Sequence, residues 1–114
     1  MKKKSNPQNY SDYLKIESLL KSQVLVSKKN GVEAHDEMLF IITHQVYELW
    51  FKQILFEIDS IFEVFDRNII DESHIATVVS RLERINVIQQ LLIDQIKILE
   101  TMTPMDFLDF RDLL

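Results

Sequence analysis

The feature that most constrains the fold is the scarcity of residues that interrupt helices. The 114 residues include one glycine and two prolines, and neither type occurs between residues 36 and 65. Strands and tight turns usually need such residues, whereas the abundant Leu, Ile, Glu, Gln and Lys favour helices. The sequence therefore predicts an all-α fold built from long antiparallel helices.

Apolar spacing and capping residues predict four helices. The first covers residues 11–26 and is followed by a turn at Gly31, the one residue that adopts positive φ without a steric cost. The second covers residues 36–65. The third begins at Asp71 or Ser73 and reaches about residue 101. The last begins at Thr103, with Pro104 at its first position, and is expected to continue to the end of the sequence.

The second helix is apolar nearly all round, and such a helix is normally enclosed by neighbouring protein. Too few other segments are present to enclose it. We therefore expect a disordered tail over residues 1–9, and over residues 10–114 a helical portion of a larger domain that is truncated here.

Charge and composition exclude several classes of function. Thirteen basic and eighteen acidic residues give a net charge of -5, which argues against a nucleic-acid surface. No cysteine is present, so disulfides and thiolate metal sites are excluded, and a cytoplasmic location fits. No segment approaches the roughly 20 apolar residues of a membrane span, so no membrane partner is expected.

His44 is the most informative single residue. Helical periodicity places it on an apolar stripe with Phe40, and Glu37 and Glu48 lie on the same side. Three interpretations remain open: a core histidine with one hydrogen bond, a metal ligand, or a group lining an apolar ligand pocket. A metal site is weakly supported, because di-iron bundles take a Glu-x-x-His pair from each of two helices and no such pair occurs.

Arg111 also has two interpretations. It follows Phe107 and Phe110, so its guanidinium could bind a carboxylate beside an aromatic wall. Alternatively, it forms a surface ion pair with Asp109 or Asp112. The residues alone favour the ion pair.

Three segments resemble those of the tryptophan 2,3-dioxygenase family. The longest is the run HDEMLFIITHQVYELWFKQIL at residues 35–55. The other two are the Tyr-x-x-Tyr-Leu element at residues 10–14 and the stretch LETMTPMDFLDFR at residues 99–111. The resemblance covers essentially everything from Tyr10 onward.

This resemblance implies an oxidoreductase of tryptophan catabolism. Members of the family are all-α homotetramers that use ferrous haem b to insert O2 across the indole C2–C3 bond of L-tryptophan. The product is N-formylkynurenine, and the reaction opens the kynurenine pathway. The implied partners are thus L-tryptophan, O2 and further copies of the chain.

The resemblance also implies roles for individual residues. His44 would be the catalytic distal histidine that meets the indole N–H, and Arg111 would pair with the substrate carboxylate. The remaining implied substrate contacts are Phe40, Ile41, Ile42, Thr43 and Phe107, together with Tyr10, Tyr13 and Leu14 from a neighbouring subunit.

The proximal histidine that ligates haem iron in this family has no counterpart among these residues, so the chain itself is expected to provide no metal ligand. We therefore expect the chain alone to be inactive and the full-length protein to be the enzyme. The alternative is a non-catalytic helical oligomerisation module, suggested by the exposed-looking apolar residues Leu108, Phe110, Leu113 and Leu114.

Overall fold

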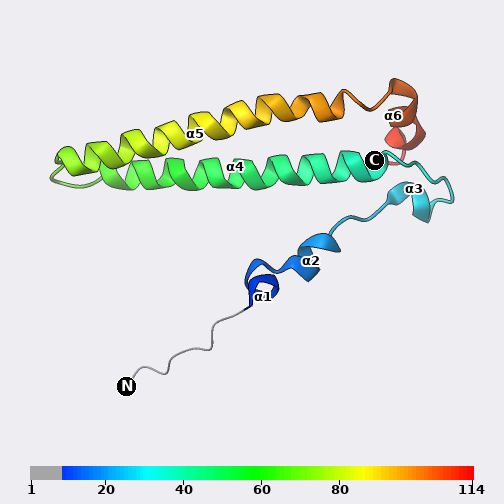
Figure 1. Cartoon of the computed structure of the whole chain (residues 1–114), viewed down its shortest axis with the longest axis horizontal. Coiled ribbons are helices and arrows are strands. Elements are labelled where there is room, and N and C mark those ends of the chain that lie inside the picture. Colours follow the sequence, from blue (N-terminus) through cyan, green and yellow to red (C-terminus); the bar gives the residue numbers. More distant parts are fainter. Residues whose placement is uncertain (1–8) are drawn as a thin grey trace, which may run out of the picture.

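Two long helices form the body of the molecule. The computed structural model describes residues 9–114. In it α4 (Glu37–Phe65) and α5 (Glu72–Leu99) lie side by side as an antiparallel hairpin, and α6 (Pro104–Arg111) folds back at the end where α4 begins (Figure 1). Every regular element in this part of the chain is a helix, which confirms the predicted all-α fold.

A small apolar seam joins the two long helices. Ile61 and Val64 of α4 pack with Val78 and Ile85 of α5, and all four side chains are at least nine-tenths buried. Leu92 and Ile88 of α5 are buried as well, whereas Ile75, Leu82 and Ile96 on the same helix are exposed. Burial of apolar surface is the main force available to hold two helices together.

Two polar contacts fix how the helices align. The Tyr47 hydroxyl donates to the Leu92 carbonyl at 2.6 Å. The buried Glu57 carboxylate accepts from the Arg84 guanidinium at 2.8 Å. Because each contact joins one residue of α4 to one residue of α5, a shift of one helical turn would break both contacts.

Most predicted helix ends are confirmed. The Asp71 side chain accepts from the His74 N–H at 3.1 Å and caps α5. Thr103 caps α6 together with Asp106, and Pro104 is the first helical residue. Gly31 has the expected positive φ of 74°. The last helix, however, ends at Arg111 and does not continue to the end of the sequence.

The predicted first helix over residues 11–26 is wrong. This segment forms α1 (Tyr10–Leu14), α2 (Ile16–Leu20) and, beyond a non-helical connector, α3 (Val26–Lys29). Lys15 breaks the helix between α1 and α2 with a left-handed φ of 54°. The apolar spacing was real, but helical spacing stabilises a helix mainly when its apolar face is buried, and α1 and α2 contain no buried residue.

The expected tail of residues 1–9 lies outside the described residues except for Asn9. The Asn9 side chain accepts from the Asp12 N–H at 2.8 Å and caps α1. Asn9 is therefore the N-cap of α1, and the rest of the predicted tail stays a prediction.

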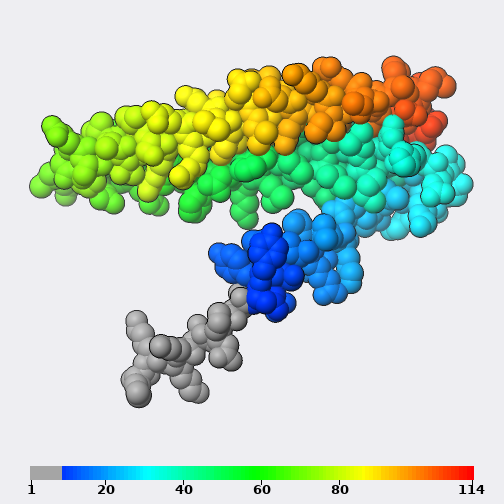
Figure 2. All heavy atoms as spheres, in the orientation of Figure 1, coloured from blue at the N-terminus to red at the C-terminus, as the bar shows by residue number. Residues whose placement is uncertain are grey.

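The molecule is elongated, and much apolar surface is uncovered. Its radius of gyration is 20.2 Å, against about 13 Å for a compact domain of this length. Figure 2 shows α1 and α2 projecting from the hairpin. Large side chains on α4, including Leu55, Phe56 and Phe62, are exposed. No helix within residues 9–114 is both long enough and apolar enough to span a lipid bilayer.

Candidate functional site

An aromatic cluster joins the first turns of α4 to α6. The Phe40 ring lies 6.0 Å from the Phe107 ring and 5.4 Å from the Phe110 ring, and the two α6 rings meet edge to face at 5.5 Å. Phe110 is 0% exposed. Its predicted exposure is therefore wrong, because α6 folds back and turns this ring onto α4. The cluster places Phe107, predicted to be near the substrate, beside Phe40.

His44 lies one turn after Phe40 at the edge of this cluster. The two rings are 4.2 Å apart. Nδ1 of His44 lies 2.7 Å from the Phe40 carbonyl oxygen. Since a carbonyl oxygen only accepts, Nδ1 carries the hydrogen, and Nε2 is the ring nitrogen available to a ligand. The ring is exposed, unlike that of a core histidine.

A mostly apolar groove of about 430 Å³ runs beside His44. Its two walls come from α4 and from the segment that includes α2 and the start of the connector to α3. The lining residues are Leu19, Ser22, His44, Gln45, Glu48, Leu49 and Lys52. An apolar groove with a few polar groups at its edge is the usual form of a site for a small organic ligand.

The three residues between Phe40 and His44 face different surroundings. Ile41 is half-buried, and Thr43 is buried with its hydroxyl donating to the Leu39 carbonyl at 2.7 Å. Ile42 is exposed and lines a smaller groove of about 190 Å³ with Leu19 and Gln45. Within this chain, therefore, these three side chains do not form one wall.

Glu37 has a role that the sequence did not indicate. Its carboxylate is fully buried and accepts hydrogen bonds from the Val26 N–H at 2.9 Å, the Ser27 N–H at 3.0 Å and the Ser27 hydroxyl. These donors belong to the first turn of α3, so Glu37 satisfies free amides of α3 and not those of its own helix. Glu37 lies three residues before Phe40, so its bonds hold α3 next to the first turn of α4, close to the aromatic cluster.

The environment of Glu37 keeps it ionised. Burial by itself raises the pKa of this carboxyl, but the hydrogen bonds from Ser27 and Val26 outweigh burial, and the pKa is lowered overall. Donated hydrogen bonds favour the charged form of a carboxylate, which is the physical cause of the net shift. Glu37 is thus occupied by α3 and does not face His44 as a metal ligand would.

Asp36 and Asp106 bring the starts of α4 and α6 together. Partial burial and the hydrogen bond to Asp106 raise the pKa of Asp36. Hydrogen bonds from Thr103 and then from Asp36 lower the pKa of Asp106. The opposite shifts in the two pKa values reflect the closeness of these carboxyl groups, which lie between the starts of α4 and α6.

The remaining predicted residues make no aromatic contact with this cluster. The Arg111 side chain is 53% exposed, and its Nε donates to Asp112 at 3.3 Å, which is the surface ion pair that the residues alone favoured. Tyr10 and Tyr13 are more than two-thirds exposed, and Leu14 is exposed as well. Figure 1 places α1, which carries these three residues, away from both long helices.

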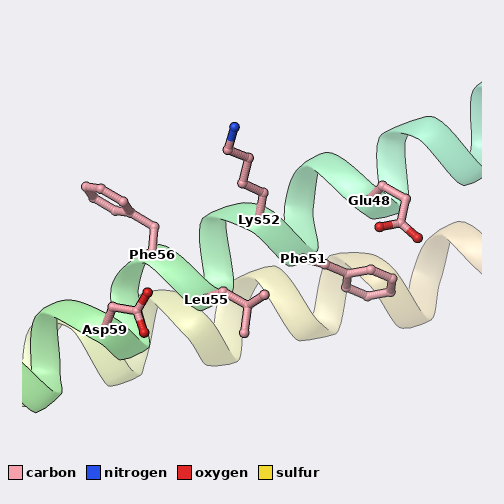
Figure 3. Close-up of a pocket in the computed structure, with 6 residues that line it drawn as sticks. All are labelled: Glu48, Phe51, Lys52, Leu55, Phe56 and Asp59. Atoms are coloured by element: carbon pink, nitrogen blue, oxygen red, sulfur yellow. The ribbon is translucent and has the colours of Figure 1, made fainter.

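A second groove lies further along α4 and contains none of the predicted substrate contacts (Figure 3). It measures about 350 Å³ and is lined by Glu48, Phe51, Lys52, Leu55, Phe56 and Asp59. Across the described part of the chain, no group of three His, Asp or Glu residues could hold a metal ion.

Comparison with known proteins agrees with these features. The family model described as tryptophan 2,3-dioxygenase matches residues 1–114. A tryptophan 2,3-dioxygenase of Alteromonas mediterranea is 52% identical over 114 residues, which are 100% of this chain and 32% of the relative. The corresponding protein of Xenopus tropicalis is 54% identical over 106 residues, covering 92% of this chain and 26% of the relative. The tryptophan 2,3-dioxygenase of Bdellovibrio bacteriovorus is 55% identical over 108 residues, which are 95% of this chain and 30% of the relative. The chain thus spans about a third or less of the length of these relatives.

We predict that Glu37→Gln lowers the free energy of unfolding at neutral pH by about 1–3 kcal/mol, because the new amide places N–H groups against the donors of α3. The folded-state pKa is lowered, so the contribution of ionised Glu37 is present above the unfolded-state pKa and is lost as pH falls through the folded-state value. Urea unfolding from about pH 6 to about pH 3 should therefore show the difference from wild type shrinking.

The matched control for this prediction is Glu33→Gln, which changes an exposed carboxylate near the start of α4. It should leave stability unchanged at both pH values. A Glu37→Gln difference that stays constant with pH would show that the ionised carboxylate is not what stabilises α3.

Proposed function

The chain belongs to the tryptophan 2,3-dioxygenase family, and from that premise we propose that it supplies the distal, substrate-binding side of a haem-dependent dioxygenase. The full-length protein would convert L-tryptophan and O2 to N-formylkynurenine. The observation that carries this proposal is the contact of His44 with Phe40, and of Phe40 with Phe107, beside an apolar groove.

In this proposal His44 orients the substrate. Its Nδ1–H is held by the Phe40 carbonyl, so Nε2 can accept a hydrogen bond from an indole N–H. Fixing one ring nitrogen through the backbone also fixes the plane of the imidazole. Removal of His44 should weaken turnover without abolishing it, because orientation contributes only part of the rate.

Phe40 and Phe107 would contact the apolar face of the indole. Aromatic rings prefer offset or edge-to-face contacts, and both rings are half-buried, with surface left to cover. A flat apolar substrate placed there would bury that surface and exclude water from the His44 side.

Arg111 would bind the substrate carboxylate. Its present contact with Asp112 is a single long hydrogen bond on an exposed side chain. Exposed ion pairs contribute little free energy, so the guanidinium can leave Asp112 for a bidentate partner at small cost.

Ile41, Ile42 and Thr43 would support this wall from α4. Tyr10, Tyr13 and Leu14 would complete the pocket of a neighbouring subunit in a homotetramer. Their exposure, and the position of α1 away from α4 in Figure 1, support a role in another copy.

Haem b, when bound, would supply the binding and activation of O2. The residues of this chain fit the substrate-facing side of such a group: an exposed histidine with a free Nε2, flanked by aromatic rings and an apolar groove. We assign no iron ligand to the described residues, and the ligand would come from another part of the full-length protein.

The full-length protein tests the proposal. We expect protein reconstituted with ferrous haem to form N-formylkynurenine from L-tryptophan and O2. The absorbance of the product measures its formation. Residues 1–114 treated in the same way should form none. A haem-loaded full-length protein without product would refute the proposal.

Arg111→Ala in the full-length protein should raise the KM for tryptophan by about 10- to 100-fold, because a charge-assisted bidentate contact is lost. Steady-state kinetics with tryptophan and with tryptamine, which lacks the carboxylate, measure the effect. The variant should lose its preference for tryptophan over tryptamine. Arg67→Ala, at the hairpin turn, is the control and should behave as wild type; an unchanged KM for Arg111→Ala would remove this residue from the site.

A helical oligomerisation module remains the alternative function, and the exposed apolar residues of α4 favour it. Sedimentation of residues 1–114 separates the two proposals. A catalytic part separated from the rest of its domain should aggregate, because its apolar surface lacks a cover. A folded, monodisperse oligomer would support the module.

A further inference from the structure

The side chain next to His44 joins α4 to the N-terminal segment. The Gln45 amide nitrogen donates to the Ser22 carbonyl at 3.0 Å, and its amide oxygen accepts from the Gln23 side chain at 2.9 Å. The Gln23 amide also donates to the Leu19 carbonyl at 3.0 Å. We call this set of bonds between Gln45, Ser22, Gln23 and Leu19 the amide clasp.

Few other contacts can hold this segment in place. Residues 21–25 are not helical, and α2 has no buried residue. Leu19 and Leu20 leave 40% and 69% of their surfaces exposed. Apolar burial is thus only partial at this contact. Glu37 holds the far end of the segment at Val26 and Ser27, and the directional hydrogen bonds of the clasp hold residues 19–23 against α4.

The clasp also determines the shape of the groove beside His44. Leu19 and Ser22 form one wall, and His44, Gln45 and Glu48 belong to the other. Gln45 is the residue of the α4 wall that bonds directly to the opposite wall. If its bonds are lost, Leu19 and Ser22 can move and the groove widens on the side of His44.

We infer that Gln45 is a positioning residue for substrate binding: it holds residues 19–23 against α4 and so sets the width of the groove that an aromatic amino acid enters beside His44. This inference rests on the proposed function for the identity of the substrate. The clasp itself acts within one chain, through contacts that need neither haem nor a second copy.

The test uses the haem-loaded full-length protein and the variant Gln45→Leu, which keeps a similar volume but removes both bonds. Gln53→Leu is the matched control, since Gln53 lies on the same helix and has no side-chain hydrogen bond within the described residues. Hydrogen exchange of the amides of residues 19–25 and of α5 is measured first in wild type and both variants. The kcat and KM for tryptophan are then measured for the same proteins.

For Gln45→Leu we expect exchange in residues 19–25 to become about tenfold faster while α5 is unchanged, because only the clasp is opened. The KM should rise about five- to tenfold with kcat within about twofold of wild type, because the loss affects binding and not the chemical step. Gln23→Leu should show a smaller effect in both measurements, and adding it to Gln45→Leu should change little further.

Unchanged exchange in residues 19–25 would overturn the inference, as would faster exchange with an unchanged KM. A fall in kcat and thermal stability without a change in KM would show a merely structural role and would also overturn it. If wild-type protein forms no N-formylkynurenine, the proposed function fails separately, and the tryptophan Kd of wild type and variants then decides the inference. A Kd that does not rise in Gln45→Leu, or an absence of tryptophan binding, overturns it.

Discussion

The packing of α5 along α4 is the interaction on which the rest of the structure depends. α4 has 29 residues and α5 has 28, and their apolar seam is short compared with their length. The apolar seam alone would permit several alignments of the two helices. Tyr47 and Glu57 each bond to one specific residue of α5, so only one alignment satisfies both bonds. α3, α6 and the connector from α2 all attach to the first turns of α4, the helix that this pairing holds in place.

Three polar contacts determine what surrounds His44. Glu37 holds α3, Asp36 meets Asp106 of α6, and Gln45 holds the connector from α2. Each lies within eight residues of His44 in the sequence, but each partner comes from a different element. The aromatic rings supply contact area, whereas these directional bonds decide which rings and walls face one another.

The large exposed apolar surface is what we expect of a chain that matches only part of the length of its relatives. The chain spans 32% or less of the proteins that it matches. A helix such as α4, apolar on most sides, is stable in water only when further protein or ligand covers it. In the proposed function this cover includes haem, neighbouring subunits and the rest of the domain, and the isolated chain retains only one of the faces of the site.

The sequence by itself determined the two long helices and the start of the last one, because capping and the absence of breakers act within a few residues: Asp71, Thr103, Pro104 and Gly31 all behave as predicted. Spacing and family resemblance also predicted Phe40, His44 and Phe107 as site residues, and the structure places the three side chains next to one another. Only the tertiary structure decided that residues 11–26 form no single helix, that Phe110 is buried, and that Glu37 and Gln45 bind other segments. The physical reason is that burial and hydrogen-bond partners depend on which distant segments contact one another. Periodicity along one helix does not predict which segments those are.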